Sequence, residues 1–234
     1  MSNPYFHFKQ FSVVQNQCAQ KISETACIQG AWTTVSAQAK NVLDIGSGTG
    51  LLGLMIAQRY EHLCIDTLEL DEATFLQGKQ NIEASRFSNR IRCLQGDIKL
   101  YVSEMPYDFI ICNPPFFENQ FVSGNGQLNV AKHSSQLTLE ELLKSIDANL
   151  SQQGECSILF PYQRLSELTT SARRFQLFPK QQLTIKHTKQ HEAKVVVVMF
   201  SRSENEICLH EDFFIQEEGQ YSKQRNELLN AYYL

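Results

Sequence analysis

The sequence predicts an α/β fold built on a doubly wound, mostly parallel sheet. From residue 41 onwards, short apolar segments of the length of buried strands alternate with longer segments that read as amphipathic helices. Several of the predicted strands are followed by a polar residue at the point where the strand ends. Because ligands of such sheets bind beyond the carboxyl ends of the strands, these residues predict one shared site. They are Asp44, Glu69, Asp97 and Asn113.

The size and composition of the chain predict a single soluble domain. The 234 residues suffice for a large core, and we find no repeat, low-complexity segment or linker. We therefore expect one domain over residues 1–234, with residues 1–40 as an N-terminal extension and residues 41–234 as a Rossmann-like core. No apolar run approaches the roughly 18–20 residues of a membrane span, and the first residues lack a signal-peptide pattern. We expect a cytoplasmic protein with no membrane partner.

Cysteine usage and charge argue against several function classes. The seven cysteines are scattered and never form a Cys-x-x-Cys pair, which argues against a disulfide framework and against a zinc site, so we expect no metal. The formal net charge of −4 has the wrong sign for a generic nucleic-acid binder. A nucleic-acid partner would need a local basic surface.

Residues 41–60 form the first predicted unit of the core, which is a strand, a glycine loop and a helix. Glycines let the backbone turn tightly and approach a ligand closely at the start of a helix. The loop is therefore a candidate ligand-binding segment. Its candidate residues are Gly46, Ser47, Gly48 and Gly50.

Two ligands are compatible with this loop. The spacing Gly48-x-Gly50-x-x-Gly53 matches the dinucleotide fingerprint, which would imply NAD or FAD. The alternative is the pattern Asp-x-Gly-x-Gly-x-Gly that begins with Asp44 at the strand end. A carboxylate there would repel a pyrophosphate but could bind an ammonium group. S-adenosylmethionine has an amino-acid end and no phosphate, so Asp44 favours that cofactor.

The next two strands supply further candidate cofactor contacts. The strand at 64–69 ends in Glu69, about 20 residues beyond the glycines, where an acid can bind ribose hydroxyls. Both cofactor hypotheses share this contact, so it indicates adenosine without choosing between them. The strand at 91–95 is followed by Asp97 and Ile98, and Asp97 could accept a hydrogen bond from the adenine amino group. A lone Gly-Asp is more often a turn.

The fourth strand, at 108–112, stops abruptly at Asn113-Pro114-Pro115-Phe116. The prolines stiffen the exit from the sheet and hold the side-chain oxygen of Asn113 and the carbonyl of Pro114 in a fixed arrangement. Two acceptors beside an aromatic ring suit a planar group that carries an exocyclic NH2, because they can bind both amine hydrogens while Phe116 stacks on the plane. Such positioning would direct the nitrogen lone pair towards an electrophile. The alternative is that the motif merely ends a strand in a proline turn.

The remainder of the chain continues the alternation. A polar stretch up to about residue 136 has little periodicity and is expected to be a mobile loop over the site. Beyond it we expect a helix at 138–152, a strand at 157–160, a helix to about 175, strands near 182–187 and 194–200, an edge strand at 207–215 and a helix at 222–234.

Basic residues cluster at two places in the chain, and the second cluster is a candidate for phosphate contacts. One contains Arg173, Arg174 and Lys180, and the other covers residues 186–194 at a predicted strand–strand turn. The alternative for the second cluster is a solvated turn.

These motifs resemble those of the class I S-adenosylmethionine-dependent methyltransferases, and more narrowly those of the bacterial tRNA(Val) adenine-N6 methyltransferases. The resemblance implies a seven-stranded sheet of order 3-2-1-4-5-7-6 with the last strand antiparallel. It implies methylation of the adenine N6 next to the anticodon, with the base unstacked. It also implies that Lys21 and Thr25 approach the methionine end of the cofactor. The narrower match rests on residues 8–11, 30–32, 113–119, 131–133 and 232–234.

Other functions remain open from the sequence. The same chemistry would serve guanine N2 in ribosomal RNA or a glutamine side chain in a protein. A non-catalytic binding subunit would keep the fold, and an NAD-dependent oxidoreductase would leave Asn113-Pro-Pro-Phe116 unexplained. We expect a monomer.

Overall fold

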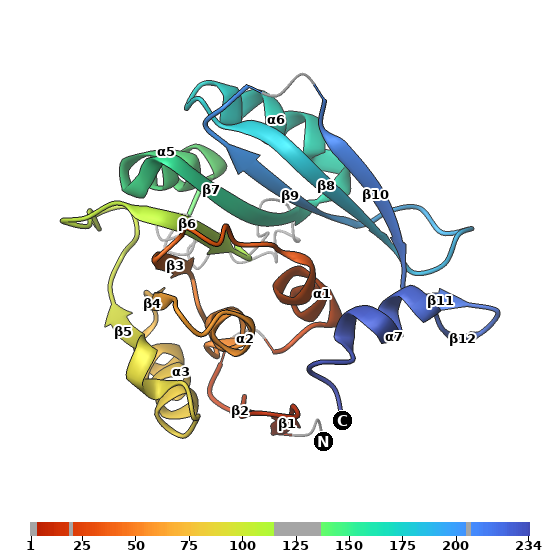
Figure 1. The fold of residues 1–234 in the computed structure, drawn as a ribbon, viewed down its shortest axis with the longest axis horizontal. Coiled ribbons are helices and arrows are strands. Elements are labelled where there is room, and N and C mark those ends of the chain that lie inside the picture. Colours follow the sequence, from red (N-terminus) through yellow and green to blue (C-terminus); the bar gives the residue numbers. More distant parts are fainter. Residues whose placement is uncertain (1–3, 19–20, 115–136, 205–206) are drawn as a thin grey trace, which may run out of the picture.

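A central sheet of eight strands organises the protein (Figure 1). The structure is a computed structural model that describes residues 4–18, 21–114, 137–204 and 207–234. In order across the sheet, the strands are β10 (Leu209–Phe214), β8 (Phe178–Lys186), β9 (Val195–Ser201), β7 (Leu150–Pro161), β6 (Tyr107–Cys112), β3 (Asn41–Ile45), β4 (Cys64–Glu69) and β5 (Ile91–Gln95).

The sheet is mostly parallel. Among the eight strands of this sheet, only β9 runs antiparallel to its neighbours, β7 and β8. From β5 to β8 the strands follow the expected order 3-2-1-4-5-7-6, which confirms the predicted topology. The sheet has one strand more than the resemblance implies. The additional strand is β10, which pairs in parallel with β8 and is the edge strand expected at 207–215.

Helices cover both faces of the sheet, as a doubly wound fold requires (Figure 1). One face carries α1 (Glu24–Trp32), α2 (Leu51–Arg59), α3 (Glu72–Glu83) and α7 (Lys223–Leu229), and the other carries α5 (Leu139–Asn149) and α6 (Leu165–Arg173). Short 3-10 segments at Ser88–Arg90 and Tyr162–Arg164 precede β5 and α6.

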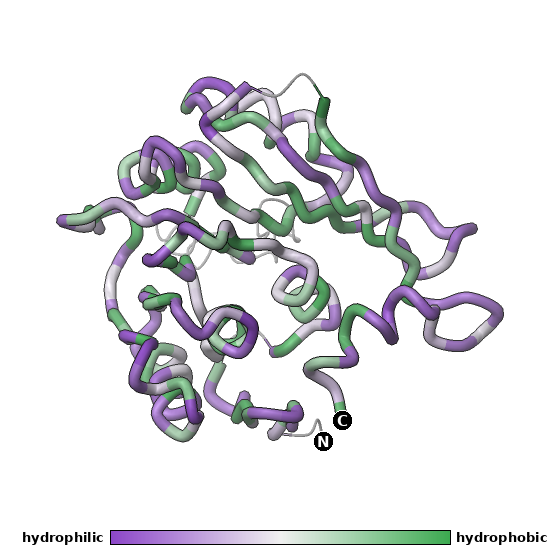
Figure 2. The backbone as a smooth tube through the Cα atoms, in the orientation of Figure 1, coloured by the Kyte–Doolittle hydropathy of each residue, from purple (hydrophilic) through white to green (hydrophobic). Residues whose placement is uncertain are grey.

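Alternation along the strands separates two apolar cores. On β6, Phe109 and Ile111 face the α1–α2 side, whereas Ile110 and Cys112 face the α5–α6 side. All four side chains are buried, so this strand is apolar on both faces, as its sequence predicts. Figure 2 shows apolar segments concentrated along the central strands.

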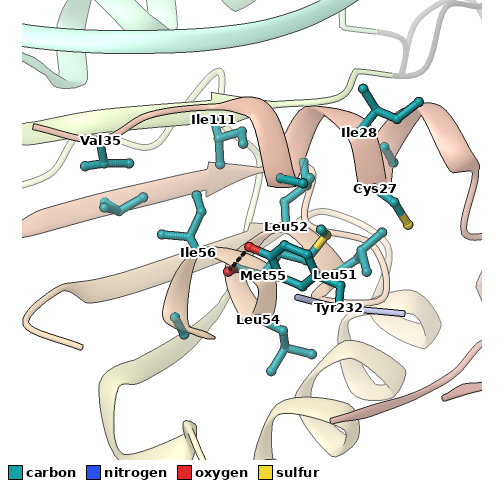
Figure 3. Packing of buried hydrophobic residues seen from close by; sticks show 14 of the residues in the cluster. Cys27, Ile28, Val35, Leu51, Leu52, Leu54, Met55, Ile56, Ile111 and Tyr232 are labelled. Atoms are coloured by element: carbon teal, nitrogen blue, oxygen red, sulfur yellow. Dashed lines mark hydrogen bonds between the residues drawn. The ribbon is translucent and has the colours of Figure 1, made fainter. Parts of the chain in front are cut away.

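The two ends of the described chain pack together. Strands β1 (Tyr5–His7) and β2 (Ser12–Val14) form a small antiparallel hairpin, consistent with the extended start expected at residues 4–14. The backbone N–H of Lys9 donates to the carbonyl of Tyr232 at 2.7 Å, and the Tyr232 hydroxyl donates to the carbonyl of Met55 at 3.1 Å (Figure 3). The C-terminal residues therefore complete the core beside α2.

Several boundaries differ from the sequence-based expectation. The strand β8 begins at Phe178 rather than near residue 182, and α7 ends at Leu229 rather than at residue 234. The largest difference is at the junction of α5 and β7. Thr138 caps α5 through a capping box with Glu141, so the helix begins where it is expected. However, α5 ends at Asn149, and β7 starts at Leu150 rather than near residue 157. Leu150 pairs with Tyr107 of β6, and pairing with both β6 and β9 continues only from Glu155, so residues 151–154 form an irregularity within β7. Pairing with strands distant in sequence overrides the weak local signal.

Within the described residues, no helix has the length and apolar character needed to cross a bilayer.

Candidate functional site

Strand register brings three of the predicted site residues into one row. Ile45 of β3 pairs with Leu68 of β4 and with Cys112 of β6. The residues that follow these three are Gly46, Glu69 and Asn113, so they lie side by side at the carboxyl edge of the sheet. Neighbouring strands are about 4.8 Å apart, which puts Glu69 and Asn113 roughly 10 Å from each other across the row.

The glycine loop connects β3 to α2 in a conformation that favours glycine. Gly46, Gly48 and Gly50 have φ values of +65°, +56° and +80°, a region that other L-residues rarely adopt. A Cβ on Gly46 would meet no atom within 4 Å, so the glycine is required by the backbone conformation and not by crowding. The loop thus borders open space at the carboxyl edge. The N–H groups of Gly46 and Ser47 both donate to the carbonyl of Leu68, at 2.9 and 3.1 Å.

Asp44 is fully buried beneath this loop. Its Oδ2 accepts a hydrogen bond of 3.0 Å from the N–H of Gly53 in the first turn of α2, while its Oδ1 has no hydrogen-bond partner. Burial raises the pKa of the carboxyl to about 7, the Gly53 N–H opposes this shift, and the charge of Glu69 adds to it. An oxygen left unpaired at the base of the loop is suited to accept from a cationic or N–H group.

Glu69 holds the loop from the neighbouring strand. Its Oε2 accepts from the N–H of Gly48 at 2.9 Å, and its Oε1 accepts from the N–H groups of Leu70 and Asp71 at 2.9 and 3.0 Å. Each carboxylate oxygen can accept more than one hydrogen bond. The same side chain can therefore orient the loop and accept from ribose hydroxyls.

Asp97 lies in a turn beyond β5, two residues past Gln95, which pairs with Glu69. Its Oδ1 accepts from the N–H of Lys99 at 2.9 Å, and its Oδ2 lies 3.6 Å from the Lys99 ammonium. The half-buried carboxylate thus stabilises a local turn and faces the same edge as Glu69. Ile98 beside it is buried.

A side chain of α1 forms a hydrogen bond to the last residue of β6. Asn113 is half-buried and Pro114 is buried at the end of the strand. The Gln29 side-chain amide, itself fully buried, donates to the carbonyl of Cys112 at 3.0 Å and lies 3.3 Å from the Ser157 hydroxyl. Pro115 and Phe116 lie outside the described residues, as does the loop expected up to residue 136.

Thr25 lies in the first turn of α1, and Lys21 lies in the segment just before that helix. Ser23 caps this helix by accepting from the N–H of Ala26, and its hydroxyl lies 3.0 Å from that of Thr25. Thr25 is half-buried and precedes Gln29 by four residues, so the two side chains share one face of α1. Lys21 is exposed just before the helix.

Two residues near the site escaped the sequence analysis. Gln29 gives no signal in sequence, because a single glutamine in an apolar segment has no characteristic spacing. Gly78 of α3 packs directly against the glycine loop, since a Cβ there would lie 2.5 Å from the carbonyl oxygen of Gly48. A glycine inside a predicted helix is the one signal that could have identified it.

A groove of about 670 Å³ opens at the amino ends of β3 to β6, where Arg92, Asp66 and Tyr107 form a hydrogen-bonded cluster. Because the row of site residues is at the carboxyl ends, this groove is separate from the site. Among the described residues, no group of three or more His, Cys, Asp or Glu side chains is arranged to bind a metal ion.

Comparison with known proteins identifies the family. The model of the family described as "Methyltransferase small domain" matches residues 31–161. A curated relative from Dyadobacter fermentans is 39% identical over 99% of this chain and 98% of its own length, and one from Bacteroides thetaiotaomicron is 35% identical over 100% and 99%. Both are named tRNA1(Val) (adenine(37)-N6)-methyltransferase. The chain belongs to this methyltransferase family.

Solved structures agree in fold. A predicted O-methyltransferase from Agrobacterium tumefaciens superposes with a TM-score of 0.66 at 16% identity, covering 88% of this chain and 95% of that one. A putative class I S-adenosylmethionine-dependent methyltransferase from Listeria monocytogenes gives 0.60 at 12% identity, covering 86% and 67%. Family membership decides between the two cofactors that the glycine loop allowed, in favour of S-adenosylmethionine. The unpaired Asp44 oxygen and the open glycine loop fit that group.

Proposed function

We propose that this protein transfers a methyl group from S-adenosylmethionine to the exocyclic N6 amine of an adenine in tRNA, next to the anticodon of tRNA(Val). The observation that carries the proposal is the row Glu69–Gly46–Asn113, which sets a candidate cofactor loop beside a candidate amine-binding residue at one sheet edge. The names of the full-length relatives support adenine in tRNA as the substrate.

In this proposal the loop residues bind the cofactor. Asp44 accepts from the ammonium end through its unpaired oxygen, Glu69 accepts from the ribose hydroxyls, and Asp97 with Ile98 borders the adenine. The backbone of residues 46–50 approaches the cofactor without side chains in the way. Lys21 and Thr25 contact its methionine end. S-adenosylmethionine supplies an electrophilic methyl group on a sulfonium.

The residues at the end of β6 orient the substrate amine. The side-chain oxygen of Asn113 and the carbonyl oxygen of Pro114 accept its two hydrogens, so the nitrogen lone pair points towards the methyl group. Pro115 stiffens this segment and Phe116 stacks on the base. The product can lose its proton to water after the transfer, so the reaction needs no general base. The rate enhancement therefore comes from positioning the amine and the methyl group.

Asn113→Ala tests this assignment. We expect methyl transfer to unmodified tRNA to be lost while the dissociation constant for S-adenosylmethionine, measured by calorimetry, stays within about twofold. Asn89→Ala, an exposed asparagine at the opposite edge, is the matched control and should retain full activity. Equal loss of transfer and of cofactor binding would contradict the role of Asn113.

Digestion of the labelled tRNA to nucleosides tests the substrate. N6-methyladenosine supports the proposal, whereas N2-methylguanosine or label in protein would keep the site chemistry and overturn the substrate. Cofactor binding without any transfer would favour a non-catalytic binding subunit.

Four attributes accompany this proposal. A tRNA-modifying enzyme is expected in the cytoplasm, and we expect one domain over residues 1–234, a monomer and a metal-independent reaction. Light scattering measures the mass, limited proteolysis tests for a second domain, and activity in the presence of EDTA tests for a metal.

A further inference from the structure

The turn between β8 and β9, residues 187–194, lies at the same sheet edge as the candidate site. Both β7 and β8 are antiparallel to β9, so they run in the same direction and end at the same edge. Val195 pairs with Pro161 of β7 and with Ile185 of β8, which aligns the end of β7 with the turn. In Figure 1 the turn projects in light blue beyond the ends of these strands.

This turn carries basic side chains whose charge is not neutralised. Lys189 and Lys194 are exposed, and neither forms an ion pair with a carboxylate of the described residues. Lys186, where the turn begins, is held by Asp212 at 2.7 Å. Glu192 is the one carboxylate in the turn itself. The free charge of the turn is therefore positive.

The other basic cluster, which contains Arg173, Arg174 and Lys180, differs from this turn in its charge and in its position on the sheet. Arg173 pairs with Glu204 at 3.1 Å, Arg174 with Glu140 at 3.0 Å, and Lys180 with Glu155 at 2.5 Å. Lys180 is near the beginning of β8, so this cluster lies at the amino edge, opposite the candidate site. Exposed ion pairs add little stability, but they cancel the local charge that a phosphate would need.

An exposed aromatic ring lies between the turn and the candidate site. The N–H of Tyr162 donates to the carbonyl of Lys194 at 2.9 Å, and the tyrosine is 39% exposed. Tyr162 follows β7, which separates β9 from β6 in the sheet. With strands about 4.8 Å apart, β9 is roughly 10 Å from β6 and Asn113.

We propose that Lys189, Lys194 and Tyr162 form an RNA-binding surface that guides the tRNA substrate to Asn113. The two ammonium groups contact phosphates, and the tyrosine ring stacks on an unpaired base that flanks the target. This inference rests on the proposed function and adds the residues that bind the nucleic acid. It also explains how a chain of net charge −4 can bind a polyanion.

Acidic residues set the direction of the RNA across this surface. The N–H groups of Ile215 and Gln216 donate to the carbonyls of Lys186 and His187, which joins the hairpin β11 (Gln216–Glu217) and β12 (Gln220–Tyr221) to the far side of β8. This hairpin contains Glu217 and Glu218, which repel phosphates. The RNA therefore runs from the turn towards β7 and β6.

The test measures binding of unmodified tRNA(Val) transcript by fluorescence anisotropy at several salt concentrations, with the double variant Lys189→Ala/Lys194→Ala. We expect weaker binding and a slope of log affinity against log salt that is smaller by about 1 for each lysine removed. The matched control is Lys40→Ala/Lys144→Ala, which removes the same charge from two exposed lysines, one before β3 at the amino edge and one on α5. The control should bind as the wild type does.

Tyr162 is tested separately. Tyr162→Ala should weaken binding with an unchanged salt slope, because a stacked ring contacts no phosphate, and Tyr162→Phe should restore it. In the transfer assay, the lysine variant should raise the KM for tRNA and leave kcat and cofactor binding unchanged.

Each outcome separates the surface from the proposed function. If the lysine variant binds tRNA with the affinity and the salt dependence of the wild type, the proposed RNA-binding surface is wrong, even when the wild type methylates tRNA. The same holds if the control loses affinity equally, since the effect would then be one of net charge. If the wild type binds tRNA through this surface but methylates no adenine, the proposed function fails and the surface stands.

Discussion

The side-chain amide of Gln29 donates a hydrogen bond of 3.0 Å to the backbone carbonyl of Cys112, the residue that precedes Asn113. The two residues are 83 positions apart in the chain. The contact links α1 of the N-terminal extension to the end of β6, so the position of Asn113 depends on a segment outside the strand–helix core.

Replacement of Gln29 by methionine tests this link. The variant keeps the length of the side chain but removes the donor to Cys112 and to the Ser157 hydroxyl, so we expect the free energy of unfolding to fall by about 1–3 kcal/mol. If the amide also positions Asn113, kcat should fall while the KM for S-adenosylmethionine changes little. Gln80→Met, at an exposed position of α3, is the control. Unchanged kcat in the folded variant would leave Gln29 a purely structural residue.

The buried carboxyl of Asp44 predicts a pH-dependent stability. Its pKa is raised from 3.8 to about 7, so between these values the folded protein holds a proton that the unfolded chain has released. The free energy of unfolding should therefore decrease as pH rises from 4 to 7, by up to about 4 kcal/mol from this group. Asp44→Asn should abolish this contribution.

Urea unfolding across this pH range measures the difference between the two proteins. The stability of Asp44→Asn relative to the wild type should increase up to about pH 7 and then level off. Glu83→Gln, which removes an exposed carboxylate on α3, should leave the wild-type pH dependence intact. Parallel curves for Asp44→Asn and the wild type would show that Asp44 titrates near its ordinary pKa.

Gly78 predicts a remote effect on cofactor binding. A methyl group there would lie 2.5 Å from the Gly48 carbonyl oxygen, and the backbone of the glycine loop must move to relieve the clash. We expect Gly78→Ala to weaken S-adenosylmethionine binding by about tenfold or more, equivalent to about 1.4 kcal/mol. Calorimetric titration measures this, and Gln80→Ala on the exposed side of the same helix should bind normally. Wild-type affinity in Gly78→Ala would mean that the loop adapts without cost.

The strand-loop-helix unit at residues 41–60 could be predicted from sequence because its signals are local. Positive φ values at Gly46, Gly48 and Gly50 follow from glycine spacing, and β3 and α2 have the expected positions. The polar residues at or next to the ends of β3, β4 and β6 were likewise predictable, because a parallel sheet puts equivalent strand ends at one edge. Their roles towards cofactor and substrate stay predictions.

Tertiary structure decided what depends on residues far apart in the chain. The early start of β7 at Leu150 results from its pairing with Tyr107 of β6, and the contacts of Gln29 and Gly78 arise only when α1 and α3 pack against the sheet. The two basic clusters look alike in sequence, yet strand direction puts one at each edge, and carboxylates from distant segments pair with every member of the first cluster but only with Lys186 among the lysines of the second. Local conformation follows from adjacent residues, whereas edge, register and charge pairing are properties of the assembled sheet.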